Sequence, residues 1–217
     1  MRSSRTSPQH RAIACALLLA AGCASLKKCA YEGSGRDESQ QPERVVGALG
    51  IAPGDRVADL GSGGGYFTFR LADAVGPKGK VYAVDIDPDM TDLVAGMARE
   101  RGAQNVEVVL AAPDDPKLPD GQIDLVFTAN TYHHIGDRVA YFTRLKRDLS
   151  SKGRVAILDY DESAGWFPHW FGHLTPTSTV ESEMKQAGYR LAAAPDFLAE
   201  QSFLVFAPAE SAPSPTS

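Results

Sequence analysis

The chain has 217 residues, of which 43% are hydrophobic and 23% charged, so it can bury one sizeable core and a single globular domain is expected. Its formal net charge of -5 argues against a protein that holds nucleic acid by neutralising phosphates, because such binding needs clustered Lys and Arg. Cys15, Cys23 and Cys29 all precede the globular part, which therefore has no thiol nucleophile or disulfide. The acidic charge balance favours a small-molecule partner. Because no HExxH or CxxC pattern is present, we expect no bound metal.

The first residues have the pattern of an export signal. Three arginines precede an apolar run at residues 12–21, which is typical of a secretory signal and too short to span a bilayer comfortably. The run ends in Leu-Ala-Ala-Gly-Cys23, which resembles the bacterial lipoprotein box. This resemblance implies export and a lipid anchor at Cys23, and Ala24, in place of Asp, implies the outer membrane. The alternatives are an ordinary signal peptide, an uncleaved anchor, or a cytoplasmic protein whose signal is not used.

The composition divides the chain into four segments. Residues 1–23 are expected to be the signal peptide, and the polar, Gly- and Ser-containing residues 24–41 a flexible tether. Residues 42–207 are expected to form the globular domain. The Pro/Ser/Ala-rich residues 208–217 have no apolar pattern and are expected to be a disordered tail.

Within residues 42–207, short β-branched runs alternate with amphipathic segments, which indicates helices packed on a mainly parallel sheet. The predicted strands are residues 56–60, 80–85, 106–110, 123–128 and 154–159. The predicted helices are one that begins at Pro42 and those at residues 67–75, 89–101, 137–149 and 179–187. Residues 76–79 and 151–153 are predicted turns, and residues 189–194 and 202–207 a final pair of strands.

The sharpest motif is a glycine-rich loop between the first strand and the next helix. Glycines at this place let the backbone turn sharply and approach a ligand, and the helix that follows offers free N–H groups. The dinucleotide fingerprint GxGxxG would need Gly at Tyr66, whereas the sequence reads DxGxGxG, which favours S-adenosylmethionine over NAD. The loop residues predicted to bind the cofactor are Asp59, Gly61, Ser62, Gly63, Gly65 and Tyr66.

The second predicted strand ends at Asp85, followed by Ile86, and both are predicted to bind the cofactor. A carboxylate at this strand end can accept hydrogen bonds from both hydroxyls of a ribose. Its distance from the glycine loop fits the roughly 20 residues expected for a ribose-binding acid. A Gly-rich turn and a surface Asp are each common alone, but their order on successive strand ends favours a cofactor site.

The glycine loop, Asp85, the segment Tyr132-His133-His134, Asp159 and the final strand together resemble class I S-adenosylmethionine-dependent methyltransferases, in a small-molecule branch akin to the quinone-biosynthesis type. The resemblance covers about residues 42–207. It implies a three-layer, doubly wound Rossmann-like α/β fold with a mainly parallel seven-stranded sheet and an antiparallel last strand. It also implies methyl transfer to a small-molecule acceptor, with Asp114 at the adenine and Asn130 in the cofactor site.

Acceptor chemistry is expected beyond the carboxyl ends of strands four and five. His133 or His134 is a candidate general base, and the alternative is that this pair only packs and hydrogen-bonds at a helix start. The aromatic stretch at residues 165–176 is a candidate acceptor pocket, with an internal aromatic plug or a lipid-facing surface as alternatives.

Two other functions stay open. Because S-adenosylmethionine is made in the cytoplasm while the N-terminus indicates export, the domain could be a catalytically inactive, envelope-anchored ligand-binding module. An NAD(P)-dependent oxidoreductase fits the fold class but not Tyr66 in the glycine loop.

Overall fold

The computed structural model describes residues 35–164 and 174–209. Its helical segments are α3 (Arg36–Gln40), α4 (Pro42–Ala48), α5 (Thr68–Val75), α6 (Pro88–Arg101), η1 (Tyr132–His134), α7 (Arg138–Leu145) and α9 (Thr177–Gln186). Its strands are β1 (Arg56–Leu60), β2 (Lys80–Asp85), β3 (Val106–Leu110), β4 (Ile123–Ala129), β5 (Leu149–Tyr160), β6 (Tyr189–Ala193) and β7 (Gln201–Pro208).

The strands form one seven-stranded sheet in the order β3-β2-β1-β4-β5-β7-β6. β1 to β5 pair in parallel, and β7 lies between β5 and β6 and is antiparallel to both. Strands that are buried on both faces need near-continuous apolar runs, and β1, β2 and β4 have them. The predicted mainly parallel sheet with an antiparallel last strand is therefore confirmed.

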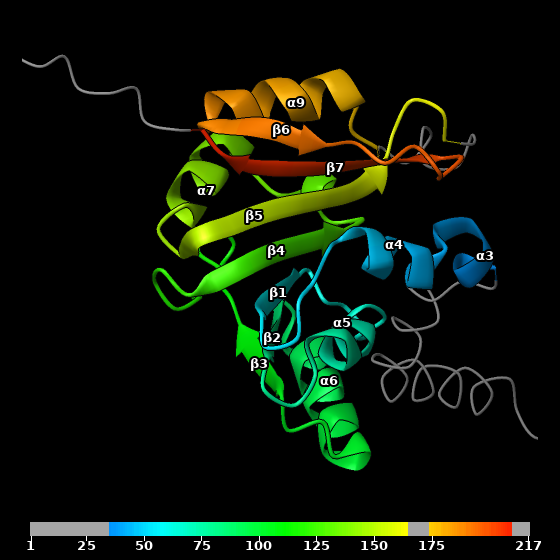
Figure 1. Cartoon of the computed structure of the whole chain (residues 1–217), viewed down its shortest axis with the longest axis vertical. Coiled ribbons are helices and arrows are strands. Elements are labelled where there is room, and N and C mark those ends of the chain that lie inside the picture. Colours follow the sequence, from blue (N-terminus) through cyan, green and yellow to red (C-terminus); the bar gives the residue numbers. More distant parts are fainter. Residues whose placement is uncertain (1–34, 165–173, 210–217) are drawn as a thin grey trace, which may run out of the picture.

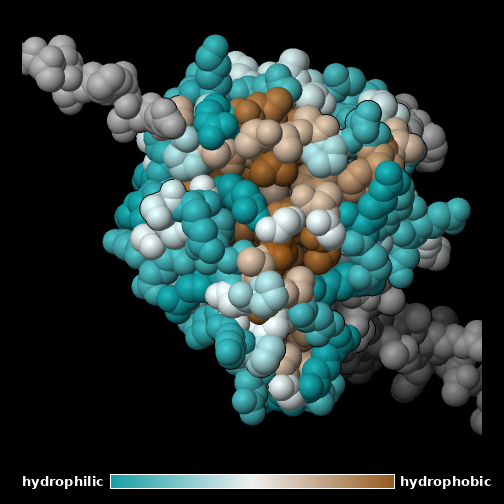
Figure 2. All heavy atoms as spheres, viewed as in Figure 1, coloured by the Kyte–Doolittle hydropathy of each residue, from teal (hydrophilic) through white to brown (hydrophobic). Residues whose placement is uncertain are grey.

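Helices cover both faces of this sheet (Figure 1). One core cluster joins Val45 of α4 and Leu71 of α5 to one face, and another joins Phe142 of α7 and Met184 of α9 to the other. In Figure 2 hydrophobic side chains gather near the centre of the face in view, inside a hydrophilic surround. The two clusters make the predicted three-layer, doubly wound architecture.

The structure corrects three of the predicted boundaries. Residues 36–40, expected to belong to the tether, form α3, and the Gln40 side chain is buried against β7, so the ordered domain begins before Pro42. The predicted turn at residues 151–153 lies inside β5, where residues 150–153 lie opposite Asp124 alone and make a bulge. The helix predicted to run to residue 149 ends at Leu145, because Leu149 pairs with Ile123 and already belongs to β5.

The C-terminal end of the domain also differs from the expectation. β7 runs to Pro208, and the Ala209 N–H donates to the carbonyl of Gly188. Residues 208 and 209, which were predicted to belong to the tail, are therefore part of the domain. In residues 35–164 and 174–209, no helix is long and apolar enough to cross a membrane. The predicted signal peptide, Cys23, most of the aromatic stretch and the rest of the tail lie outside the described residues.

Candidate functional site

A cavity of about 480 Å³ opens at the carboxyl ends of β1, β2 and β4. Its walls come from the glycine loop, the segment after β2, the connection from β3 to β4, the η1 region and α3. The residues that line it are Arg36, Leu60–Gly64, Val84–Asp87, Met90, Ala111–Pro113, Ala129–Thr131, His134–Gly136 and Tyr141. Strand ends of a doubly wound sheet are where such folds bind ligands, because the connections there diverge and leave a crevice.

Two of the glycines in the glycine loop, Gly61 and Gly63, have different surroundings. Gly61 has a φ of +77°, and a Cβ placed there would lie 2.2 Å from Oγ1 of Thr131, so this glycine permits close packing against the loop after β4. Gly63 also has a positive φ, but a Cβ there would meet no atom of the described residues within 4 Å, because the position faces open space. The buried Oγ of Ser62 has no hydrogen-bond partner among the described residues. The loop thus offers free space and an unused polar group to a ligand.

Asp85 is held firmly at the cavity wall. Its Oδ2 accepts a hydrogen bond from the Gly63 N–H at 2.8 Å, and its Oδ1 accepts one from the Asp87 N–H at 2.9 Å. Each carboxylate oxygen keeps further acceptor capacity, so Asp85 can still receive two hydroxyl groups. Ile86, with 61% of its surface exposed, lies next to it on the cavity wall. This arrangement fits the ribose of an adenosine cofactor.

The wall beyond Asp85 is mainly apolar and suits a planar base. Met90, Ala111, Pro113 and Tyr141 line it. Asp114, predicted to contact adenine, is not among the lining residues, and its carbonyl oxygen accepts a hydrogen bond from Arg144. The connection from β3 turns back through the bridge between Ala112 and Asp115, which explains why a position counted along the sequence misses the cavity.

Three further predicted cofactor residues lie outside this cavity: Asp59, Gly65 and Tyr66. Asp59 is only 3% exposed and accepts a 2.6 Å hydrogen bond from the Thr68 hydroxyl, which ties β1 to α5. Burial raises the pKa of Asp59 to about 6. Asp59 thus does not line the cavity, and its carboxyl group is engaged by Thr68 within the fold.

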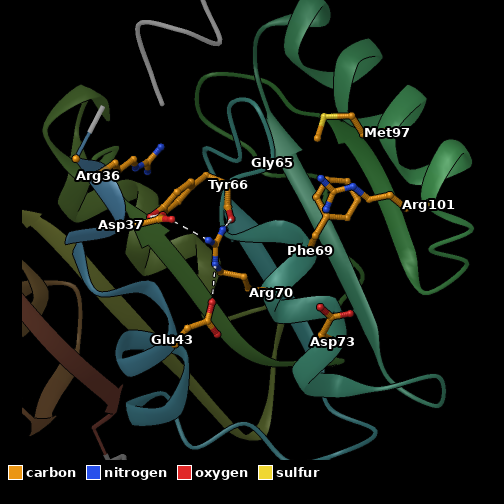
Figure 3. Close-up of a pocket in the computed structure, with 11 residues that line it drawn as sticks. Arg36, Asp37, Glu43, Gly65, Tyr66, Phe69, Arg70, Asp73, Met97 and Arg101 are labelled. Carbon is orange, nitrogen blue, oxygen red and sulfur yellow. Dashed lines mark hydrogen bonds and ion pairs between the residues drawn. The ribbon is translucent and has the colours of Figure 1, made fainter. Parts of the chain in front are cut away.

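Gly65 and Tyr66 line a second cavity of about 620 Å³ on the other side of the loop (Figure 3). The Tyr66 hydroxyl donates to Oδ1 of Asp37 at 2.5 Å, and the Arg36 guanidinium lies 3.8 Å from the centre of the Tyr66 ring. Arg70 reaches Asp37 from the other side, at 3.4 Å. Tyr66 therefore fixes α3 beside the glycine loop. This contact was not predicted, because residues 36 and 37 belong to the predicted tether.

The two histidines of η1 have different surroundings, although their ring centres lie 4.1 Å apart. His134 lines the cofactor cavity, whereas the His133 side chain is 5% exposed and its Nδ1 lies 2.8 Å from Oδ1 of the fully buried Asp159. The Asp159 carboxylate also accepts the backbone N–H of His133 at 3.0 Å. Of the two predicted candidates for a general base, the geometry brings only His134 to the cavity. His133 instead anchors η1 to the end of β5.

A second set of contacts holds η1 from the opposite side. The hydroxyl of the buried Tyr132 donates to Glu183 of α9 at 2.7 Å. Arg138 of α7 donates to both oxygens of the same carboxylate, at 2.7 and 2.8 Å. These hydrogen bonds, those of Arg138 first, lower the pKa of Glu183. Residues 132–134 are thus fixed between β5, α7 and α9, which holds His134 at the cavity.

Several cavity residues were not predicted from their place in the sequence, among them Arg36, Asp87, Met90 and Tyr141. Asp87 could have been found, since an Asp before Pro88 is a common helix start, and its side chain accepts the Asp89 N–H at the beginning of α6. Arg36 and Tyr141 gave no comparable signal. They reach the cavity only because α3 and α7 fold against it.

Comparison with known proteins assigns this arrangement to a family. A methyltransferase domain model matches residues 51–196, and the chain belongs to that family. The chain is 32% identical to aklanonic acid methyltransferase DauC of Streptomyces sp. (strain C5), over 61% of its own length and 60% of the relative. It is 30% identical to the ubiquinone/menaquinone biosynthesis C-methyltransferase UbiE of Shewanella oneidensis, over 54% of its own length and 47% of the relative. It therefore spans about half the length of these relatives.

Solved structures agree with this family. A SAM-dependent methyltransferase from Aquifex aeolicus superposes with a TM-score of 0.75 at 28% identity, covering 84% of this chain and 96% of the other. The fold and the cofactor, S-adenosylmethionine, are those predicted from the sequence. The described cavity fits this cofactor: open space at Gly63, the unpartnered Ser62 hydroxyl and the oriented Asp85 carboxylate can all receive it.

Proposed function

We propose that this protein transfers a methyl group from S-adenosylmethionine to a small-molecule acceptor. The observation that carries the proposal is the Asp85 carboxylate, held by the N–H groups of Gly63 and Asp87 in a cavity whose glycine loop leaves room for a ligand. When bound, the cofactor supplies an electrophilic methyl group on a sulfonium. The protein then has to align the acceptor and exclude water, with proton removal only where the acceptor needs it.

The cavity extends from the end of β2 to the end of β4, which suits this chemistry. Its apolar wall at Met90, Ala111 and Pro113 lies beyond β2, where a nucleobase would rest, while Asn130 follows β4 on the other side of the glycine loop. A ligand whose ribose is held at Asp85 would extend across β1 toward Asn130. Relatives named for aklanonic acid and for ubiquinone or menaquinone act on small molecules, which supports an acceptor of that class.

His134 is the candidate general base, because it lines the cavity and an imidazole titrates near neutral pH. Replacing His134 by Asn should lower the release of S-adenosylhomocysteine on any acceptor that needs deprotonation, by roughly 10²- to 10⁴-fold. Affinity for the cofactor should stay near that of the native protein. Equal turnover in the variant would leave His134 with a positioning role only.

The intact loop and Asp85 do not favour a catalytically inactive ligand-binding module. The test is calorimetric titration of the whole chain with S-adenosylmethionine and S-adenosylhomocysteine. The Asp85→Ala change removes hydrogen bonds to a charged carboxylate, each of which contributes about 1.5 to 3 kcal/mol. The affinity for both ligands should therefore fall at least tenfold. Asp92→Asn, at an exposed position of α6, is the matched control and should bind like the native chain. Absence of binding by the native chain would refute the proposal.

We also propose that the protein is exported and anchored by a lipid on Cys23, as the signal-like N-terminus indicates. The support is the sequence pattern alone, since these residues lie outside the described part of the chain. Fatty-acid labelling of the native chain and of Cys23→Ser in a bacterial host tests it. Equal labelling of both chains, or none of the native one, would refute the anchor.

A further inference from the structure

Four side chains form a continuous line of hydrogen bonds behind the cofactor cavity. Nε of Arg36 donates to Oε1 of Gln40 at 2.6 Å, and Nε2 of Gln40 donates to Oε1 of Gln201 at 3.1 Å. Nε2 of Gln201 then donates to Oδ1 of Asn130 at 2.6 Å. This amide relay joins α3, β7 and the loop after β4, and Arg36 and Asn130 at its two ends both line the cavity.

The chemistry of Arg36 sets the direction of the relay. A guanidinium can only donate hydrogen bonds, so Gln40 must turn its carbonyl oxygen toward Arg36 and its NH₂ group toward Gln201. Gln201 must then accept with its oxygen and donate its own NH₂ group to Asn130. Because the Asn130 oxygen accepts this bond, the side chain is oriented with its NH₂ group as the end that can donate to a ligand. The relay thus decides that the Asn130 side chain acts as a donor.

The surroundings make this orientation costly to reverse. Gln40 is 1% exposed and Gln201 6% exposed, so water cannot replace a bond that is broken inside the relay. The backbone of Asn130 is fixed too, because its N–H donates to the Leu158 carbonyl at 2.8 Å and its φ is +54°. Arg36 is held over the Tyr66 ring, as Figure 3 shows. Both ends of the relay therefore have defined places at the cavity.

We propose that the amide relay is a positioning device that makes this end of the cavity present hydrogen-bond donors, Arg36 and the Asn130 amide, to the carboxylate of the cofactor's amino-acid group. The inference rests on the proposed function, because it takes the cofactor to lie with its ribose at Asp85. From there the amino-acid group lies on the β4 side, which is the side of Asn130. Gln40 and Gln201 act only through Asn130 and Arg36.

Two ligands separate this role from a general effect on the cavity. S-adenosylhomocysteine carries the amino-acid group, whereas 5′-methylthioadenosine has the same nucleoside without it. In Gln201→Glu the new carboxylate can still accept from Gln40 but cannot donate to Asn130, so the Asn130 amide has to turn its oxygen toward the ligand. In Asn130→Asp the bond from Gln201 is kept, while the ligand meets a carboxylate in place of an amide donor.

Both variants are titrated calorimetrically as whole chains with each ligand. We expect the affinity for S-adenosylhomocysteine to fall about tenfold or more, as for a lost charge-assisted hydrogen bond, with 5′-methylthioadenosine bound within about twofold of the native value. Gln122→Glu is the matched control, because Gln122 precedes β4 at the opposite end of the strands and its side chain bonds Arg56. This variant should bind both ligands normally.

The titrations distinguish failure of the relay from failure of the proposed function. Unchanged affinity for S-adenosylhomocysteine in both variants, or an equal loss for the two ligands, would overturn the relay while leaving the methyltransferase proposal in place. Failure of the native chain to bind either ligand would instead remove the proposed function, and the relay with it. Thermal unfolding of each variant verifies that it is folded at the titration temperature.

Discussion

Asp59 belongs to the glycine-loop motif, and its buried carboxyl group makes the stability of the fold depend on pH. Its carboxyl group is buried and hydrogen-bonded to Thr68, and burial raises its pKa to about 6. An unfolded Asp loses its proton near pH 3.9, so between these two values the folded state binds the extra proton. Stability contributed by this group is therefore greatest below pH 4 and declines as the pH rises through 6, opposite to the usual behaviour of a paired carboxylate.

This linkage predicts the effect of Asp59→Asn, which keeps an acceptor for Thr68 and cannot ionise. The free energy of unfolding of the native chain, relative to this variant, should fall by on the order of 2 kcal/mol between pH 4 and pH 6.5. Denaturant unfolding of both proteins across this range measures the difference. Parallel pH profiles would show that Asp59 ionises as readily in the folded state as in the unfolded one.

At the scale of elements, η1 depends on contacts made by helices that follow it in the sequence. Arg138 and Glu183 join α7 to α9 and hold the Tyr132 hydroxyl, and both side chains are less than one quarter exposed. Removing Arg138 as Arg138→Met should lower the free energy of unfolding by about 1 to 2 kcal/mol at pH 7, more than an exposed pair contributes. Because the pKa of Glu183 is lowered in the native protein, the loss should shrink as the pH falls below about 4.

The exposed pair of Lys80 and Glu107 offers a control for this experiment. It has a similar distance, 2.8 Å, but its side chains are 37% and 51% exposed. Lys80→Met should therefore change the free energy of unfolding by less than about 1 kcal/mol. Denaturant titrations of both variants give the comparison, and equal effects would mean that the Arg138 pair does not hold the η1 region.

At the scale of the whole molecule, α3, the first helix of the described residues, links the two ends of the domain. α3 meets β7 through Gln40 and the glycine loop through Tyr66, and Figure 1 shows α3 and α4 beside the end of the sheet at which β5 finishes. A chain that begins at Pro42 would lack α3, and the buried carbonyl oxygen of the Gln201 side chain would lose the hydrogen bond that it accepts from Gln40. We expect its thermal midpoint to lie several degrees below that of a chain that begins at Gly35. Equal midpoints would show that α3 adds nothing to stability.

The course of the chain explains which features could be predicted. Alternating β-branched and amphipathic segments predict the five parallel strands, because their periodicity is a local property, and three of them have the predicted bounds. The tether prediction was wrong at residues 36–40, because a polar composition hides contacts that only a distant strand can provide. The bulge in β5 escaped prediction for a similar reason: Gly153 packs against Leu149 and the carbonyl of Ile123 on the neighbouring strand.

For the site, the sequence by itself determined the cofactor class and predicted two candidate anchors for it. The glycine loop and Asp85 lie in short segments of the chain. In such segments the chemistry of the ligand dictates the residue types, so the pattern can be recognised without the rest of the fold. Only the tertiary structure decided that His134 and not His133 lines the cavity, and that Asp59 and Tyr66 lie outside it. It also decided that Gln40, Gln201 and Asn130 form a line of hydrogen bonds. The physical reason is distance along the chain: Gln40 and Gln201 are 161 positions apart, and hydrogen bonds over such separations exist only once the sheet has brought both ends of the domain together.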